Sequence, residues 1–207
     1  MRRVTRDARG FTLAELLVAC AVLGLLMGAV FTLQRQGQFT YLVGAARVEV
    51  QQNARLGLDT MMNDLRLARL VDDNPDTTQV VSAIDANCST GGPPASGGGT
   101  SITVRVGDWD PAGTLQADTV VAYSLVGASC ATSATGCELR RNAVTVVGGV
   151  QSLQIWCYNG NGALSNVLAD IRELRIQIRT RTERPAQAGS PGDQHAVVEG
   201  RLRFRNI

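Results

Sequence analysis

The first strong pattern along the chain is an apolar stretch from residue 11 to residue 33, FTLAELLVACAVLGLLMGAVFTL, whose single charge is Glu15. At 1.5 Å per residue, a helix of this length can cross a bilayer. The polar residues 34–36 follow it, so the chain re-enters a polar environment on the far side. An ionised carboxylate in hydrocarbon costs several kcal/mol unless something compensates for it, and Glu15 therefore needs an explanation.

The helical pattern continues beyond the apolar stretch. Apolar residues recur along one helix face at Val43, Val50, Ala54, Met61, Leu65 and Ala68. Such spacing is typical of an amphipathic helix packed on a domain. No proline occurs between residues 11 and 74, and Pro75 then disfavours further helix. The pattern predicts one helix over about residues 12–71, with a transmembrane half at 11–33 and an amphipathic half at 34–71.

After residue 75 the apolar period changes from that of a helix to that of a strand. Leu174, Ile176 and Ile178 alternate with polar residues, which is typical of an antiparallel strand with one wet face. The expected strands cover residues 100–106, 118–126, 138–141, 143–147, 152–158, 171–182 and 196–204. We therefore expect an α+β protein in which a long helix packs on an antiparallel sheet within a β-rich globular domain, residues 72–207.

Charge sets the expected orientation of the chain. All twenty basic residues are arginines, so lysine-based covalent chemistry is excluded. Residues 1–10 hold four arginines against Asp7, a net charge of +3, whereas the rest of the chain holds sixteen arginines and seventeen acids. Nucleic-acid binding is therefore not indicated. The positive-inside rule places residues 1–10 in the cytoplasm and the globular domain outside it.

Three interpretations of the apolar stretch compete. An ordinary secretory signal peptide has a shorter apolar region without an acid. A lipoprotein signal is suggested by Leu17-Val18-Ala19-Cys20, with Cys20 as the lipidated residue, but a strongly apolar segment would then begin the mature chain. That interpretation belongs to a different functional class, a membrane-anchored extracytoplasmic lipoprotein or enzyme.

The third interpretation rests on Gly10-Phe11-Thr12-Leu13-Ala14-Glu15, which resembles the signal of type IV prepilins. The resemblance implies that residues 1–10 are a leader, that a prepilin peptidase cuts between Gly10 and Phe11, and that the new amine of Phe11 is methylated. It also implies that Glu15 pairs with the N-terminal amine of a neighbouring subunit. The alternative is an unpaired Glu15 that reaches the membrane interface. Gly24 and Gly28 have the GxxxG spacing that permits close helix packing.

Later stretches resemble one branch of this family. Residues 51–68 are similar to the PilW family of minor pilins and to GspJ-type minor pseudopilins of type II secretion. The PilW family is also resembled by residues 146–158 and 170–183 and by the final RLRFRNI. The resemblance implies a pilin fold and a non-enzymatic subunit of a priming or tip complex. The implied partners are other minor and major pilins, the assembly platform and, before assembly, the bilayer of the inner membrane. The implied location is the inner membrane, with the domain in the periplasm, and then the pilus.

The cysteines predict disulfides. Cys20 lies in the apolar stretch, and the other four fall in the domain expected outside the cytoplasm, where disulfides form. Four cysteines allow three pairings. Cys130 and Cys137 enclose a short loop between two expected strands and are the best local pair, which leaves Cys88 with Cys157. Free thiols and a zinc site are the alternatives.

The sequence gives little support for catalysis or cofactor binding. The single histidine, His195, lies in a loop near Asp193, but no serine is placed beside them. The acidic residues 72–76 lack the glycine and distal glutamate of a calcium loop. The arginines between residues 172 and 184 are interpreted as one solvated strand face, with contacts to acidic neighbours in a filament or to DNA as the alternatives. We expect no enzyme activity, cofactor or metal.

Overall fold

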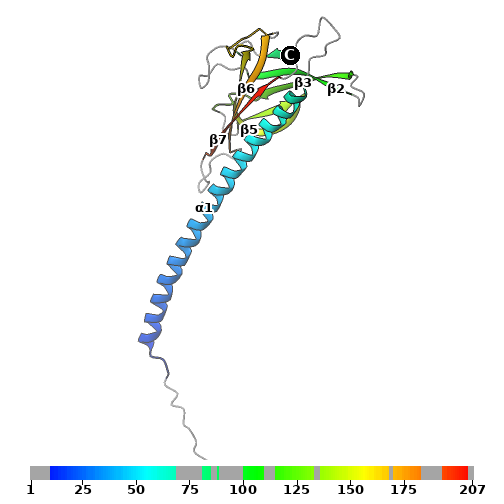
Figure 1. The fold of residues 1–207 in the computed structure, drawn as a ribbon. Helices are drawn as coiled ribbons and strands as arrows, with labels where there is room; N and C mark the ends of the chain where they lie inside the picture. The colour runs from blue at the N-terminus through cyan, green and yellow to red at the C-terminus, as the bar shows by residue number, and fades with distance from the viewer. Residues whose placement is uncertain are drawn as a thin grey trace, which may run out of the picture. The chain divides into compact units, whose positions relative to one another are not determined.

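The computed structural model describes residues 10–68, 81–84, 88, 100–109, 115–132, 136–167, 170–182 and 193–204. The chain divides into two units, Met1–Leu42 and Val43–Ile207. The first unit contains the beginning of a long helix. The second contains the rest of that helix together with a β-sheet (Figure 1).

Helix α1 runs without interruption over Leu13–Leu67. The absence of proline permits this length, as expected from the sequence. The helix begins one residue later than expected. It ends at Leu67 rather than near residue 71, since Ala68 no longer has helical structure. The acidic turn and Pro75, which we expected to end the helix, lie outside the described residues.

The described strands form one seven-stranded antiparallel sheet in which every strand pairs with its neighbours in the sequence. The strands are β1 (Val81–Ile84), β2 (Ser101–Trp109), β3 (Leu115–Val126), β4 (Cys137–Arg141), β5 (Val144–Asn159), β6 (Ile171–Arg181) and β7 (His195–Arg203). The architecture is the α+β, pilin-like fold expected from the sequence.

Two features of the sheet differ from the expected strands. Strand β1 was not expected, because its four residues are too short to show alternation. The two strands expected at 143–147 and 152–158 form the single strand β5. Gly149 has a φ of +67° in this strand, and the pairing of β5 with β6 shifts between Val150 and Ser152. A bulge at this point bends the strand without ending it.

The core of the second unit lies between α1 and one face of the sheet. The helix contributes the buried side chains Val50, Ala54, Leu58, Met61, Met62 and Leu65. Opposite them, the buried side chains of the sheet include Ile102, Val121, Leu139, Ile155, Leu174, Ile176 and Ile178. The buried helix positions follow the expected spacing, so the amphipathic pattern identified the packed face correctly.

Two glycines let the helix approach the sheet closely. A Cβ atom added at Gly57 of α1 would lie 3.0 Å from Cγ1 of Val147. On strand β7, a Cβ atom at Gly200 would lie 3.2 Å from Cδ1 of Leu58. An alanine at either position would require the neighbouring side chains to shift by a few tenths of an ångström. Gly57 weakens the helix locally, and this close packing explains its presence there.

Polar contacts join the helix to the sheet at two levels. The buried hydroxyl of Thr180 donates a hydrogen bond to the carbonyl oxygen of Val50, at 2.9 Å. Near the end of the helix, Oδ2 of Asp64 accepts the hydroxyl of Tyr123 at 2.5 Å and Nε of Arg141 at 2.6 Å. Burial raises the pKa of Tyr123, and the carboxylate of Asp64 raises it further. Asp64 therefore holds strands β3 and β4 on the last turn of α1.

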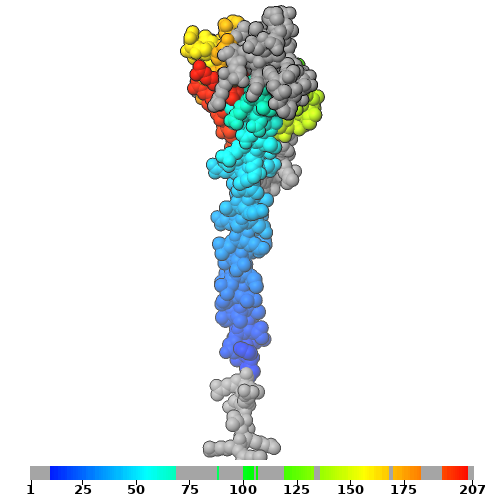
Figure 2. Space-filling model, turned by 45° about the vertical axis from the view of Figure 1, so that its right-hand side comes forward, coloured from blue at the N-terminus to red at the C-terminus, as the bar shows by residue number. Residues whose placement is uncertain are grey.

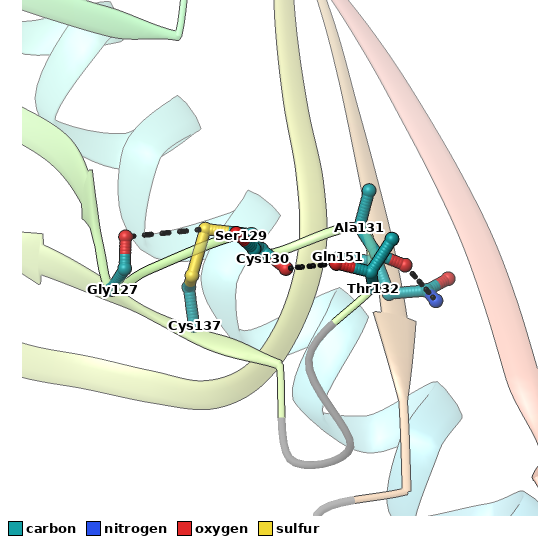
Figure 3. Close-up of a disulfide and its surroundings, with 7 residues drawn as sticks. All are labelled: Gly127, Ser129, Cys130, Ala131, Thr132, Cys137 and Gln151. Atoms are coloured by element: carbon teal, nitrogen blue, oxygen red, sulfur yellow. Dashed lines mark hydrogen bonds between the residues drawn. A yellow bond between two sulfur atoms is a disulfide. The ribbon is translucent and has the colours of Figure 1, made fainter.

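Two disulfides stabilise the second unit. Cys88 is bonded to Cys157 of β5, and Cys130 is bonded to Cys137 at the start of β4, the same pairs that the sequence favoured. Figure 3 shows the second disulfide beside Gly127, the residue that follows β3. A Cβ atom at Gly127, whose φ is +149°, would lie 2.4 Å from Sγ of Cys137. The disulfide and this glycine together close the connection between β3 and β4.

The role of Asp64 leads to a stability prediction. The substitution Asp64→Ala leaves Arg141 and Tyr123 without their shared acceptor, which should lower the free energy of unfolding by about 2 kcal/mol. Asp59→Ala is the matched control, because Asp59 is exposed on the same helix and should change stability by less than about 0.5 kcal/mol. Chemical denaturation of the full chain in detergent measures both. Equal losses for the two variants would contradict the role given to Asp64.

Candidate functional site

The residues that resemble a prepilin cleavage site lie immediately before α1. Gly10, Phe11 and Thr12 are described, and none of them is helical. Phe11 is 87% exposed, and a Cβ atom added at Gly10 would meet nothing within 4 Å. Helical backbone resists proteolysis because its peptide groups are bonded within the helix. The peptide bond between Gly10 and Phe11 is therefore free of the helix and accessible.

Thr12 and Glu15 form a capping box at the start of the helix. Oε2 of Glu15 accepts hydrogen bonds from the backbone N–H and the hydroxyl of Thr12, both at 3.0 Å. In return, the backbone N–H of Glu15 donates to Oγ1 of Thr12 at 3.3 Å. This reciprocal pattern satisfies two of the backbone donors that every helix start leaves unpaired. The carboxylate is also favoured by the positive end of the helix dipole.

The capping box partly explains why a carboxylate occurs at the start of the apolar helix. The carboxylate has a partner in its own chain, so it is not an isolated charge at the start of an apolar helix. Its other oxygen, Oε1, has no partner among the described residues. Glu15 can therefore keep its bond to Thr12 and still accept a cation. The threonine-x-x-glutamate spacing is visible in the sequence, but the capping box was not among the roles expected for Glu15, which were pairing with a neighbouring subunit and reaching the membrane interface.

The apolar part of α1 is exposed. Most of its large side chains are more than half exposed, among them Leu13, Leu17, Leu25, Met27 and Leu33 (Figure 2). By length and composition this helix can cross a membrane. Gly24 and Gly28 have no atoms near their Cβ positions, and Cys20 is an exposed free thiol. The described residues thus place no contact at the GxxxG spacing, and its role in packing against another helix stays a prediction.

Two of the arginines of β6, Arg175 and Arg181, are paired with acids. Nε of Arg175 lies 2.5 Å from Oε1 of Glu199, and this guanidinium lowers the pKa of Glu199. Arg181 pairs with Asp193 at 2.5 Å. On the neighbouring strand β7, Arg201 pairs with Glu173 of β6. The charges of Arg175 and Arg181 are therefore locally balanced, whereas Arg179 of the same strand is exposed. Arg184 lies outside the described residues.

The remaining sequence candidates for chemistry are only partly described. Nε2 of His195 lies 3.2 Å from Oδ2 of Asp193, an oxygen that Arg181 also binds. The carboxylate thus orients both neighbours at the edge of the sheet. Among the described residues, no group of three or more histidine, cysteine, aspartate or glutamate side chains is arranged to hold a metal ion. The acidic residues 72–76 lie outside the described part of the chain.

Comparison with known proteins identifies one feature of the chain. The model of the prokaryotic N-terminal methylation motif matches residues 5–31. No curated protein and no solved structure matches the chain. The matched region contains the accessible bond at Gly10, the capping box and the GxxxG spacing. The motif indicates a type IV pilin-like prepilin, and together with the apolar helix it indicates membrane anchoring.

The capping box predicts how the helix start responds to mutation. Thr12→Val removes the hydroxyl but keeps the shape of the side chain, and loss of a cap costs about 1 kcal/mol. The backbone amide of Glu15, which loses its acceptor, should then exchange hydrogen roughly fivefold faster. Thr32→Val is the matched control, because the hydroxyl of Thr32 bonds to the carbonyl of Ala29 inside the same apolar stretch. Unchanged exchange at the amide of Glu15 in Thr12→Val would contradict the capping role.

Proposed function

We propose that this pilin-like prepilin is a structural minor pilin, similar to the PilW family, that is incorporated into a type IV filament. The observation that carries the proposal is the order of features at the N-terminus. An accessible Gly10–Phe11 bond comes first, then the capping box of Thr12 and Glu15, and then an exposed apolar helix. The motif match over residues 5–31 supports the same proposal.

The proposed processing takes place at the membrane. A prepilin peptidase removes residues 1–10 by cutting before Phe11, whose new amine is methylated. The four arginines of the leader keep this end in the cytoplasm. Two disulfides in the second unit support its location in the periplasm, since cytoplasmic thiols are kept reduced. The subunit then waits in the inner membrane until the assembly platform moves it into the filament.

In the filament we assign Glu15 a docking role. Its Oε2 stays bonded to Thr12, and its free Oε1 accepts the N-terminal amine of a neighbouring pilin. Apolar helices that bundle together exclude water, so this ion pair favours the correct alignment of neighbours. The proposed position is a priming or tip complex with other minor and major pilins. A minor pseudopilin of type II secretion, similar to GspJ, is the second candidate, because it shares the N-terminal features on which the proposal rests.

The N-terminus of the mature chain tests the processing step. The protein is purified from membranes of cells with and without prepilin peptidase, and its N-terminal peptide is identified by mass spectrometry. We expect a chain that begins with N-methylated Phe11 in the first cells and with the intact leader in the second. A lipid-modified Cys20 at the N-terminus would instead identify a lipoprotein, and an intact leader in both would exclude processing.

Two variants of Glu15 separate capping from docking. Glu15→Gln keeps a side chain that completes a capping box but removes the charge, whereas Glu15→Ala removes both. If docking uses the charge, both variants should insert into the membrane normally and both should be depleted at least tenfold from sheared filaments. Immunoblots of filament and membrane fractions measure this depletion. Normal incorporation of Glu15→Gln would show that the charge has no docking role.

A further inference from the structure

Both asparagine–glycine pairs of the sequence lie in one turn, Asn159-Gly160-Asn161-Gly162. The turn follows β5, and the chain then returns alongside it, with Tyr158 bridged to Leu164. Gly160, Asn161 and Gly162 are exposed. The proposed role of the N-terminus makes no use of this turn.

We propose that Asn161 is a site of spontaneous deamidation. The backbone nitrogen of Gly162, after losing its proton, attacks the carboxamide carbon of Asn161. A carbon–nitrogen bond forms, and ammonia leaves. Water then opens the cyclic imide at either of its carbonyl groups, which yields aspartate or isoaspartate. The net reaction converts an amide and water into a carboxylate and ammonium, and it requires no oxidant, cofactor or enzyme.

The geometry leaves Asn161 open to this reaction. Its side chain has no hydrogen bond among the described residues, and only its backbone N–H is engaged, with Oδ1 of Asn159. Gly162 has a φ of +79°, and nothing lies within 4 Å of its Cβ position. The attacking nitrogen is therefore uncrowded. Its N–H donates to the carbonyl oxygen of Asn159 at 3.0 Å, so this single bond must open first.

The neighbouring Asn159 is more firmly held, although a glycine also follows it. Its side-chain Oδ1 accepts the backbone N–H groups of Asn161 at 3.0 Å and of Ala163 at 2.9 Å. Both bonds must break before the carboxamide can turn toward the nitrogen of Gly160. Asn159 is thus held by one more hydrogen bond than Asn161, which corresponds to an about fivefold lower rate of deamidation. The fold therefore distinguishes two asparagines that are chemically alike in the sequence.

Deamidation changes the turn in two ways. Each event adds a negative charge on an exposed surface, close to the side chain of Arg172, which Gly160 faces. The isoaspartate product also lengthens the backbone between residues 161 and 162 by one methylene group. The turn is closed by short backbone bonds, such as the one from Asn159 N–H to the carbonyl of Ala163 at 2.8 Å, and it must readjust. Older molecules would thus differ from new ones in charge and local structure.

The experiment follows the full-length oxidised protein in detergent at neutral and mildly alkaline pH. Timed samples are digested, and mass spectrometry after chromatography that resolves isoaspartate measures conversion at each asparagine. We expect Asn161 to convert about fivefold faster than Asn159, and faster still at the higher pH. Asn166 is an internal control, because it is exposed but followed by the β-branched Val167 and should stay an amide.

Two further samples separate the effect of the fold from that of the sequence. In denatured and reduced protein, Asn159 and Asn161 should convert at similar rates. In Gly160→Ala, the only remaining asparagine–glycine pair is at Asn161, whose conversion should be unchanged. Alanine fits at residue 160, where a Cβ atom would lie 3.8 Å from Cγ of Arg172. Equal rates in the folded protein, or no conversion of Asn161 while the denatured chain reacts, would overturn the proposal.

Discussion

The constraint on which the other features depend is that one helix must satisfy two environments. Between Val50 and Leu65, α1 buries one face against the sheet. Between Leu13 and Leu33, its large apolar side chains are exposed. Apolar surface in water costs about 25 cal/mol per Å², so the first part of the helix requires lipid or other helices. Because the chain joins these two environments, it needs targeting signals at its N-terminus and a stable domain at its C-terminal end.

Polar groups stabilise the helix at both ends, but they differ in how visible they are in the sequence. The capping box joins two residues only three positions apart, so the spacing of Thr12 and Glu15 is enough to predict it. The contacts of Asp64 join residues 59 and 77 positions apart. No local pattern reveals which strands will meet the last turn of the helix. Asp64 lies near the C-terminal end of the helix, where the helix dipole disfavours a negative charge. This unfavourable position was the one sign in the sequence that Asp64 has a special role.

The sheet was predictable where its strands have one buried and one wet face. The alternation in β6 identified Leu174, Ile176 and Ile178 as core residues, and burial confirms them. It failed for β1, which is too short, and for β5, where a bulge interrupts the period of two without ending the strand. The ion pair between Arg175 and Glu199 was also hidden, because these residues meet only through the register of β6 with β7. Register depends on packing of the whole sheet and is weakly encoded by any single strand.

The strand order has a consequence for how the second unit folds. Because each strand pairs with the next strand in the sequence, the sheet can grow strand by strand in chain order. The helix, however, completes its packing only when Gly200 on the last strand meets Leu58. Until β7 is in place, Leu58 therefore lacks its close contact at Gly200, and β6 has an unpaired edge. A chain shortened before this nine-residue strand would expose that edge to pairing with other chains.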